Sequence, residues 1–150
     1  MGIAGELGKH HPWYLGCLFN LASCYQSQSR YTDALRLNSE CYAGSVQVLG
    51  RDHPNSLACL MSMAKCHFRM GHTAESLRLC EECREGRGRV LGFEHPEYLE
   101  TCSLAAGLLF ALGNRDKSRR YAVEARDALM RTGCNPGLLR TVEKTLSQLG

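Results

Sequence analysis

Residues 49–54 read LGRDHP, and close copies of this hexapeptide stand at residues 7–12 (LGKHHP) and 91–96 (LGFEHP). The copies are 42 residues apart both times, without a gap. Glycine suits the left-handed position that ends a helix, and proline suits a first helical turn, where the missing N–H is not needed. The motif therefore predicts the end of one helix and the start of the next, three times in fixed register.

Between the motifs the chain has the pattern of paired helices. A first helix of about 16 residues is expected over 13–28, 55–70 and 97–112, followed by a short break and a second helix that runs to the next Leu-Gly. Apolar residues recur at helical spacing within the first helices. A period near 40 also occurs in β-propellers and in HEAT or armadillo arrays, but no run of alternating strand residues is present, which excludes the propeller. We therefore predict an all-α chain of about three helix-turn-helix repeats.

Residues 11–54 resemble the 42-residue tetratricopeptide repeats of kinesin light chains and related scaffold proteins. The resemblance covers residues 3–133 and is carried best by Asn20-Leu21-Ala22, Tyr25, Arg30-Tyr31 and Ala34. The chain departs from the family where a small residue becomes Ser76 and Ser118, and where Asn38 replaces an aromatic residue. The resemblance implies a right-handed α-α superhelix, the tetratricopeptide solenoid.

The repeat register predicts the domain organisation. We expect one array with repeats at 11–52, 53–94 and 95–133, and with residues 3–10 as the tail of a preceding repeat. Asn135 and Pro136 suit a helix N-cap and first turn, so a capping helix is predicted at 135–149. Its apolar residues form one stripe for the last repeat, and its polar residues face water. The apolar members are Leu138, Leu139, Val142, Leu146 and Leu149.

Charge and hydropathy argue against nucleic-acid and membrane partners. The net charge is only +3, and the basic residues of 115–131 are interleaved with Asp116, Glu124 and Asp127, as on a solvated helix face. The most apolar run, 104–112, is far shorter than the roughly 20 residues that span a bilayer. We expect a cytoplasmic protein, and the resemblance adds an association with the cytoskeleton.

The cysteines and histidines are interpreted as structural. Six of the nine cysteines stand 42 residues from another cysteine, at positions where the family uses small or medium apolar residues, so packing as reduced thiols explains them. Cys80-x-x-Cys83 has no second ligand pair at zinc-site spacing. His11, His53 and His95 recur with the turn and are expected to cap or pack it. We predict no metal, no cofactor and no enzymatic activity.

The resemblance places a partner-binding groove on the concave wall, which the first helices line. Asn20 matches the family asparagine that hydrogen-bonds the backbone of a bound peptide, while Lys65 and Arg69 are expected to attract an acidic residue unless they are simply solvated. Phe19 and Met61 would supply apolar contacts. The full set of predicted partner-binding residues is Phe19, Asn20, Ser23, Ser27, Met61, Ser62, Lys65, Arg69, Glu100 and Ser103.

Two functions remain open from the sequence. The first is a scaffold or adaptor that binds a peptide segment of a partner protein, with a cytoskeletal or motor-cargo role by resemblance alone. The second is a structural repeat segment of a larger protein, with no peptide ligand, that self-associates through the open N-terminal repeat face.

Overall fold

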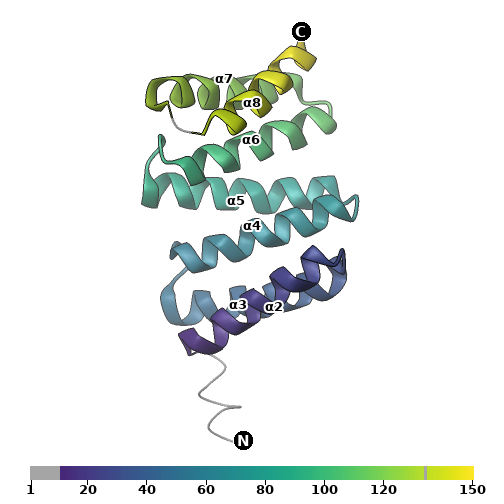
Figure 1. Cartoon of the computed structure of the whole chain (residues 1–150), viewed down its shortest axis with the longest axis vertical. Coiled ribbons are helices and arrows are strands. Elements are labelled where there is room, and N and C mark those ends of the chain that lie inside the picture. The colour runs from purple at the N-terminus through teal and green to yellow at the C-terminus, as the bar shows by residue number, and fades with distance from the viewer. Residues whose placement is uncertain (1–10, 134) are drawn as a thin grey trace, which may run out of the picture. The chain divides into compact units, whose positions relative to one another are not determined.

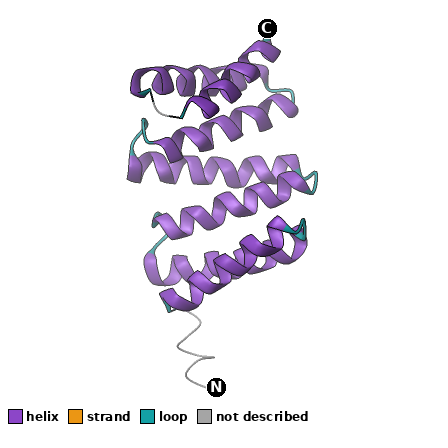
Figure 2. Cartoon of the chain, viewed as in Figure 1, coloured by secondary structure: helices purple, strands orange, loops and turns teal. Residues whose placement is uncertain are grey.

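The computed structural model describes residues 11–133 and 135–150, and every regular element within them is an α-helix (Figure 2). The expected tail at 3–10 lies outside the described residues. The helices are α2 (Pro12–Ser27), α3 (Tyr31–Leu49), α4 (Pro54–Arg69), α5 (Thr73–Leu91), α6 (Pro96–Ala111), α7 (Arg115–Thr132) and α8 (Pro136–Leu149). None of them is long and apolar enough to cross a membrane.

The chain forms two compact units, Met1–Leu79 and Cys80–Gly150, so the boundary falls inside α5. In unit 1, α3 packs against both α2 and α4; in unit 2, α7 packs against both α6 and α8 (Figure 1). The proposed repeat limits at 52/53 and 94/95 differ from this division and stay a prediction.

The three histidines of the LGxxHP motif cap the helices that follow them. The Nδ1 atoms of His11, His53 and His95 accept hydrogen bonds at 3.0–3.1 Å from the backbone N–H two residues later. Gly50 and Gly92 have φ of 98° and 91°, where a side chain would be strained. The sequence prediction of a capping histidine is confirmed, since each helix gains a partner for one of its orphan N–H groups.

In two of the three described helix pairs, a buried serine joins the second helix to the first. Ser76 and Ser118 are fully buried, and their hydroxyls donate to the carbonyls of Ala64 and Ala106 at 2.6 and 2.7 Å. Ala34 occupies the equivalent buried position in α3. Serine can therefore replace the family's small residue at these two positions, because each buried hydroxyl has a hydrogen-bond partner.

A polar cluster ties the C-terminal part of α5 to α6 and α7 in unit 2. The Arg84 guanidinium donates to the hydroxyls of Tyr98 and Tyr121 at 3.1 and 2.8 Å and lies over the Tyr121 ring. The Tyr121 hydroxyl in turn donates to Glu81 at 2.8 Å. These contacts hold Arg84 charged while it is largely covered.

The last helix, α8, behaves as the predicted cap of unit 2. Val142 and Leu149 are buried, whereas Arg140, Glu143 and Lys144 on the opposite face are exposed. The Asn135 side chain accepts from the Leu138 N–H at 3.0 Å. Arg115 and Arg119 of α7 donate to the Leu149 carbonyl, at the end of the helix where the carbonyls are otherwise unpaired.

Candidate functional site

Unit 1 contains a cavity of about 160 Å³ between its two first helices, α2 and α4. α2 contributes Leu15, Gly16, Phe19 and Asn20 to its walls, and α4 contributes Asn55, Ala58 and Cys59. Cys41 and Ser45 of α3 complete the lining. Because Gly16 and Ala58 carry little or no side chain, the two helices leave a hollow at this level.

Exposed residues continue from the cavity along both first helices, at the spacing of one helix face. On α2 these are Gly16, Asn20, Ser23 and Ser27; on α4 they are Ala58, Ser62, Lys65 and Arg69, which are exposed or half-buried. Spacings of three and four residues keep each set on one face. We call these eight residues the first-helix surface.

Asn20 is the polar group of this surface that is best placed to bind a ligand. It is exposed, lines the cavity, and makes no side-chain hydrogen bond to any described residue. A carboxamide both donates and accepts hydrogen bonds, so it can pair with both the C=O and the N–H of a peptide backbone. Across the cavity, Asn55 offers a second carboxamide.

The two serines predicted for the site are exposed, but their hydroxyls are already engaged. Ser23 donates to the Phe19 carbonyl and Ser27 donates to the Ser23 carbonyl, both at 3.1 Å. Such bonds, one helical turn back, satisfy the hydroxyl hydrogen and leave its oxygen free to accept. To a ligand, these serines therefore offer hydrogen-bond acceptors and no free donor.

Two predicted contact residues are buried, which corrects the sequence prediction. Phe19, Met61 and Ser103 are equivalent positions 42 residues apart, yet Phe19 is half-buried while Met61 and Ser103 are only 4% and 7% exposed. α3 packs on α4, and the C-terminal part of α5 contacts α6, whereas no described helix precedes α2, which carries Phe19. Met61 and Ser103 consequently offer no surface to a partner.

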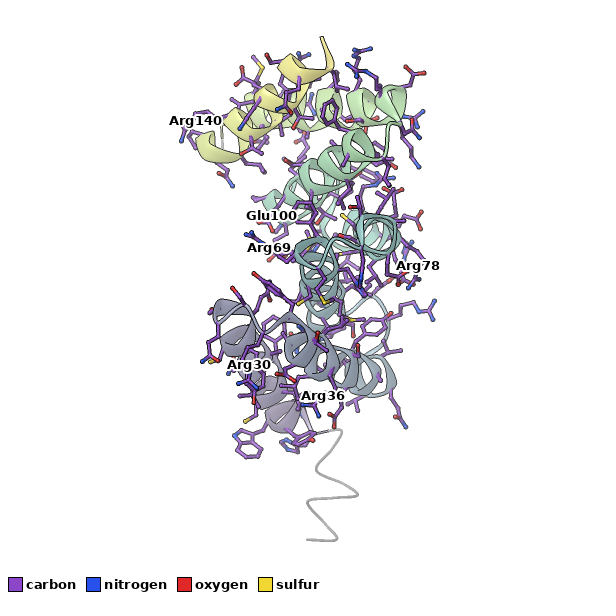
Figure 3. The ribbon with its side chains drawn as sticks, turned by 90° about the vertical axis from the view of Figure 1, so that its right-hand side faces the viewer. Arg30, Arg36, Arg69, Arg78, Glu100 and Arg140 are labelled. Atoms are coloured by element: carbon purple, nitrogen blue, oxygen red, sulfur yellow. The ribbon has the colours of Figure 1, made fainter. Side chains whose placement is uncertain are left out.

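Basic groups stand at the far end of the first-helix surface. Lys65 and Arg69 are exposed one turn apart on α4, and Arg69 forms no ion pair with any described residue. Figure 3 shows Arg69 and Arg78 on opposite sides of unit 1, and Arg78 is held by Glu75 at 2.6 Å. Glu100, which is exposed on α6, belongs to unit 2.

The cavity floor holds two thiols that sequence analysis treated only as packing residues. The Cys59 thiol donates to the Cys41 sulfur at 3.2 Å, and this hydrogen bond lowers the pKa of Cys41 while raising that of Cys59. The 42-residue register pairs Cys41 with Cys83 and Cys59 with Cys17, so it gave no signal of the contact. Ser45 lies one turn after Cys41 on the same face of α3, and the repeat register likewise gave no signal that it lines the cavity.

Among the residues that the structure describes, no three His, Cys, Asp or Glu side chains are grouped so that they could hold a metal ion. His67 and His72 of unit 1 approach each other, with Nδ1 atoms 3.2 Å apart. Burial is the main cause that lowers the pKa of His67.

Comparison with known proteins identifies the fold. The family model described as tetratricopeptide repeat matches residues 14–78, and no curated protein matches the chain. A crystal structure of nearly identical TPR-like repeats of a putative kinesin light chain from Podosopora anserina is 21% identical and superposes with a TM-score of 0.76, over 93% of this chain and 71% of that one. BtubC (BKLC) from P. vanneervenii is 14% identical, with a TM-score of 0.76, over 91% of this chain and 57% of that one.

Proposed function

We propose that the chain, in which the tetratricopeptide-repeat family model matches residues 14–78 and which shares the fold of kinesin light chain-like repeats, is a protein-interaction scaffold that binds a peptide segment of a partner on the first-helix surface of unit 1. It acts by binding and not by catalysis, and it works in the cytoplasm, in association with the cytoskeleton. No nucleic acid, membrane or cofactor takes part.

The observation that carries the proposal is the cavity beside Asn20. A volume of about 160 Å³ is enough for a medium-sized apolar side chain, since a single water occupies about 30 Å³. Phe19 supplies a half-buried apolar wall, and the Asn20 carboxamide at the rim can pair with the peptide backbone next to the inserted side chain. Apolar lining with a few placed polar groups is the general character of a binding site.

The basic residues Lys65 and Arg69, at one end of the first-helix surface, favour a ligand with an acidic residue. Ala58 and Arg69 are eleven residues apart on α4, which at 1.5 Å per residue is about 16 Å. An extended peptide of about five residues covers that distance. We therefore propose a short peptide with one apolar residue at the cavity and an acidic residue about five positions away, near Lys65 and Arg69.

The test is a selection from a phage-displayed random peptide library, followed by fluorescence anisotropy titration of the peptides obtained. Ala58→Leu fills the cavity and Asn20→Ala removes the carboxamide, so the double variant should bind the selected peptides at least about tenfold more weakly. Gln47→Ala, on the exposed face of α3, is the matched control and should bind as the unchanged chain does.

Two results would refute this function. One is a failure to select any peptide under conditions in which the chain is folded. The other is selected peptides whose affinity is the same for the double variant and for Gln47→Ala, because they would then bind elsewhere on the chain.

A second function, self-association of a structural repeat segment, is favoured by the exposed face of α2. Trp13 is 73% exposed and Leu21 is 45% exposed, and Cys17 and Cys24 share their face and are also exposed. The equivalents of these cysteines in α4, Cys59 and Cys66, are fully buried. The apolar stripe of α2, formed by Trp13, Cys17, Leu21 and Cys24, is therefore a surface that a further helix would cover.

A further inference from the structure

Cys41 of α3 and Cys59 of α4 form a buried pair of thiols in contact. The two residues are 2% and 0% exposed, and their Sγ atoms are 3.2 Å apart. A disulfide bond measures about 2.05 Å, so the sulfurs need to approach by only about 1 Å to be joined. The two helices that carry them pack directly against each other.

The cavity gives a small polar oxidant a route to this pair. Cys41 and Cys59 both line it, together with the carboxamide-bearing Asn20 and Asn55. The buried Ser45 hydroxyl also lines the cavity, next to the two thiols, and its interaction with Cys41 lowers the pKa of that thiol. A volume of about 160 Å³ holds several molecules of the size of water, and the polar groups of the lining give a peroxide partners to bind.

We propose that Cys41 and Cys59 form a reversible disulfide site that is oxidised by peroxides. In the first step the Cys41 thiolate attacks hydrogen peroxide: an S–O bond forms, the O–O bond breaks, and the departing hydroxide takes up a proton to become water. In the second step the Cys59 sulfur attacks the sulfenic acid, the S–S bond forms and a second water leaves with the Cys59 proton. Two thiols and one hydrogen peroxide thus give one disulfide and two waters.

The chemistry of the pair assigns the order of attack. The hydrogen bond from Cys59 stabilises the Cys41 thiolate and lowers the pKa of Cys41 against the opposing effect of burial, whereas burial is the main cause that raises the pKa of Cys66, Cys83 and Cys102. Since the thiolate is the nucleophile, Cys41 reacts first and Cys59 resolves. The bond would join the second helix of one pair to the first helix of the next, beneath the cavity.

The sequence makes the product easy to identify. Trypsin cleaves after Arg36, Arg51 and Lys65, so residues 37–51 contain Cys41 as their only cysteine and residues 52–65 contain Cys59 as their only cysteine. The folded chain is treated with one molar equivalent of hydrogen peroxide, free thiols are blocked in denaturant, and the digest is analysed by mass spectrometry. We expect the two peptides joined, with the loss of two hydrogen atoms, and separated again by dithiothreitol.

Variants distinguish this pair from the other thiols. Cys66→Ala removes another buried cysteine of α4 and should leave the cross-link yield unchanged. Cys59→Ala should abolish the cross-link and leave Cys41 as a sulfenic acid that dimedone traps, with helicity checked by circular dichroism. The proposal is overturned if Cys41 and Cys59 of the unchanged chain are recovered as free thiols, as separate sulfonic acids, or in disulfides with other cysteines.

Discussion

Asn38 is a buried polar residue that the packing of α3 does not satisfy. It is 1% exposed, and neither its carboxamide nitrogen nor its oxygen has a hydrogen-bond partner among the described residues. A buried donor or acceptor without a partner costs about 1–3 kcal/mol of folding free energy. Sequence comparison with the family singled out the position, but could not show whether the amide was paired.

We predict that Asn38→Leu stabilises the chain. Leucine has the shape of asparagine without the two unpaired groups, so the free energy of unfolding should rise by about 2 kcal/mol. Urea denaturation followed by circular dichroism measures it. Gln47→Leu, an exposed change on the same helix, should stay within about 0.5 kcal/mol of the unchanged chain. A loss of stability in Asn38→Leu would mean that the amide is satisfied in the folded protein.

His67 gives unit 1 a sensitivity to acid. Burial lowers its pKa, His72 and Arg78 lower it further, and Glu75 opposes them. His67 is therefore harder to protonate in the folded state than in the unfolded chain. The stabilisation is complete above the unfolded pKa of about 6.5 and is lost as the pH falls through the lower folded pKa.

The corresponding prediction is that His67→Gln flattens this part of the pH profile. Between about pH 7 and pH 5, the unfolding free energy of the unchanged chain should fall more steeply than that of His67→Gln. Denaturation midpoints measured across this range test it. Parallel profiles for the two proteins would contradict the prediction, because protonation of His67 would then be equally easy in the folded and unfolded states.

At the scale of the helices, the LGxxHP motif was sufficient to predict where each first helix begins, and the short break after it predicted where that helix ends. The first helix expected over 13–28 is observed at Pro12–Ser27. The helices expected over 55–70 and 97–112 are likewise observed one residue earlier, at Pro54–Arg69 and Pro96–Ala111. Such accuracy has a local cause, since the glycine with positive φ, the histidine cap and the proline all act within a few residues. These features need no knowledge of the rest of the fold.

The histidine caps are open to a direct test on α4. We predict that His53→Ala lowers the unfolding free energy by about 1 kcal/mol, because the Asn55 N–H loses its acceptor. His53→Asn should restore most of the loss, since its side-chain oxygen can accept at the same place. Thermal and urea denaturation give the values, with the exposed Arg51→Ala as control. Equal stability of the Ala and Asn variants would contradict the assignment of His53 as a helix cap.

Depth of burial was harder to predict than helix position. The periodicity assigned Phe19, Met61 and Ser103 to one equivalent position, but their exposure differs because it depends on which helices lie on either side. The contact between Cys41 and Cys59 likewise depends on how α3 and α4 pack, which no spacing along the chain encodes. Faces of helices could be predicted from the sequence; cavities and contacts between helices could not.

For the whole molecule, the apolar stripe of α2 separates the two proposed functions. Trp13 is the only tryptophan in the sequence, so its fluorescence reports directly on whether the stripe becomes covered. If copies of the chain associate there, the emission should shift to shorter wavelength as concentration rises, and sedimentation velocity should show a dimer. The driving force is the burial of Trp13 and Leu21, at about 25 cal/mol per Å² of apolar surface.

Leu21→Lys keeps the fluorophore and places a charge in the middle of this stripe, so we predict that it abolishes both the emission shift and the dimer. Val48→Lys, which changes a similarly exposed apolar residue on α3, should leave both intact. A chain that is monomeric at all concentrations, or a dimer unaffected by Leu21→Lys, would exclude self-association through α2. Peptide binding by a chain held monomeric in this way would then favour the scaffold function, since the first-helix surface works without a second copy.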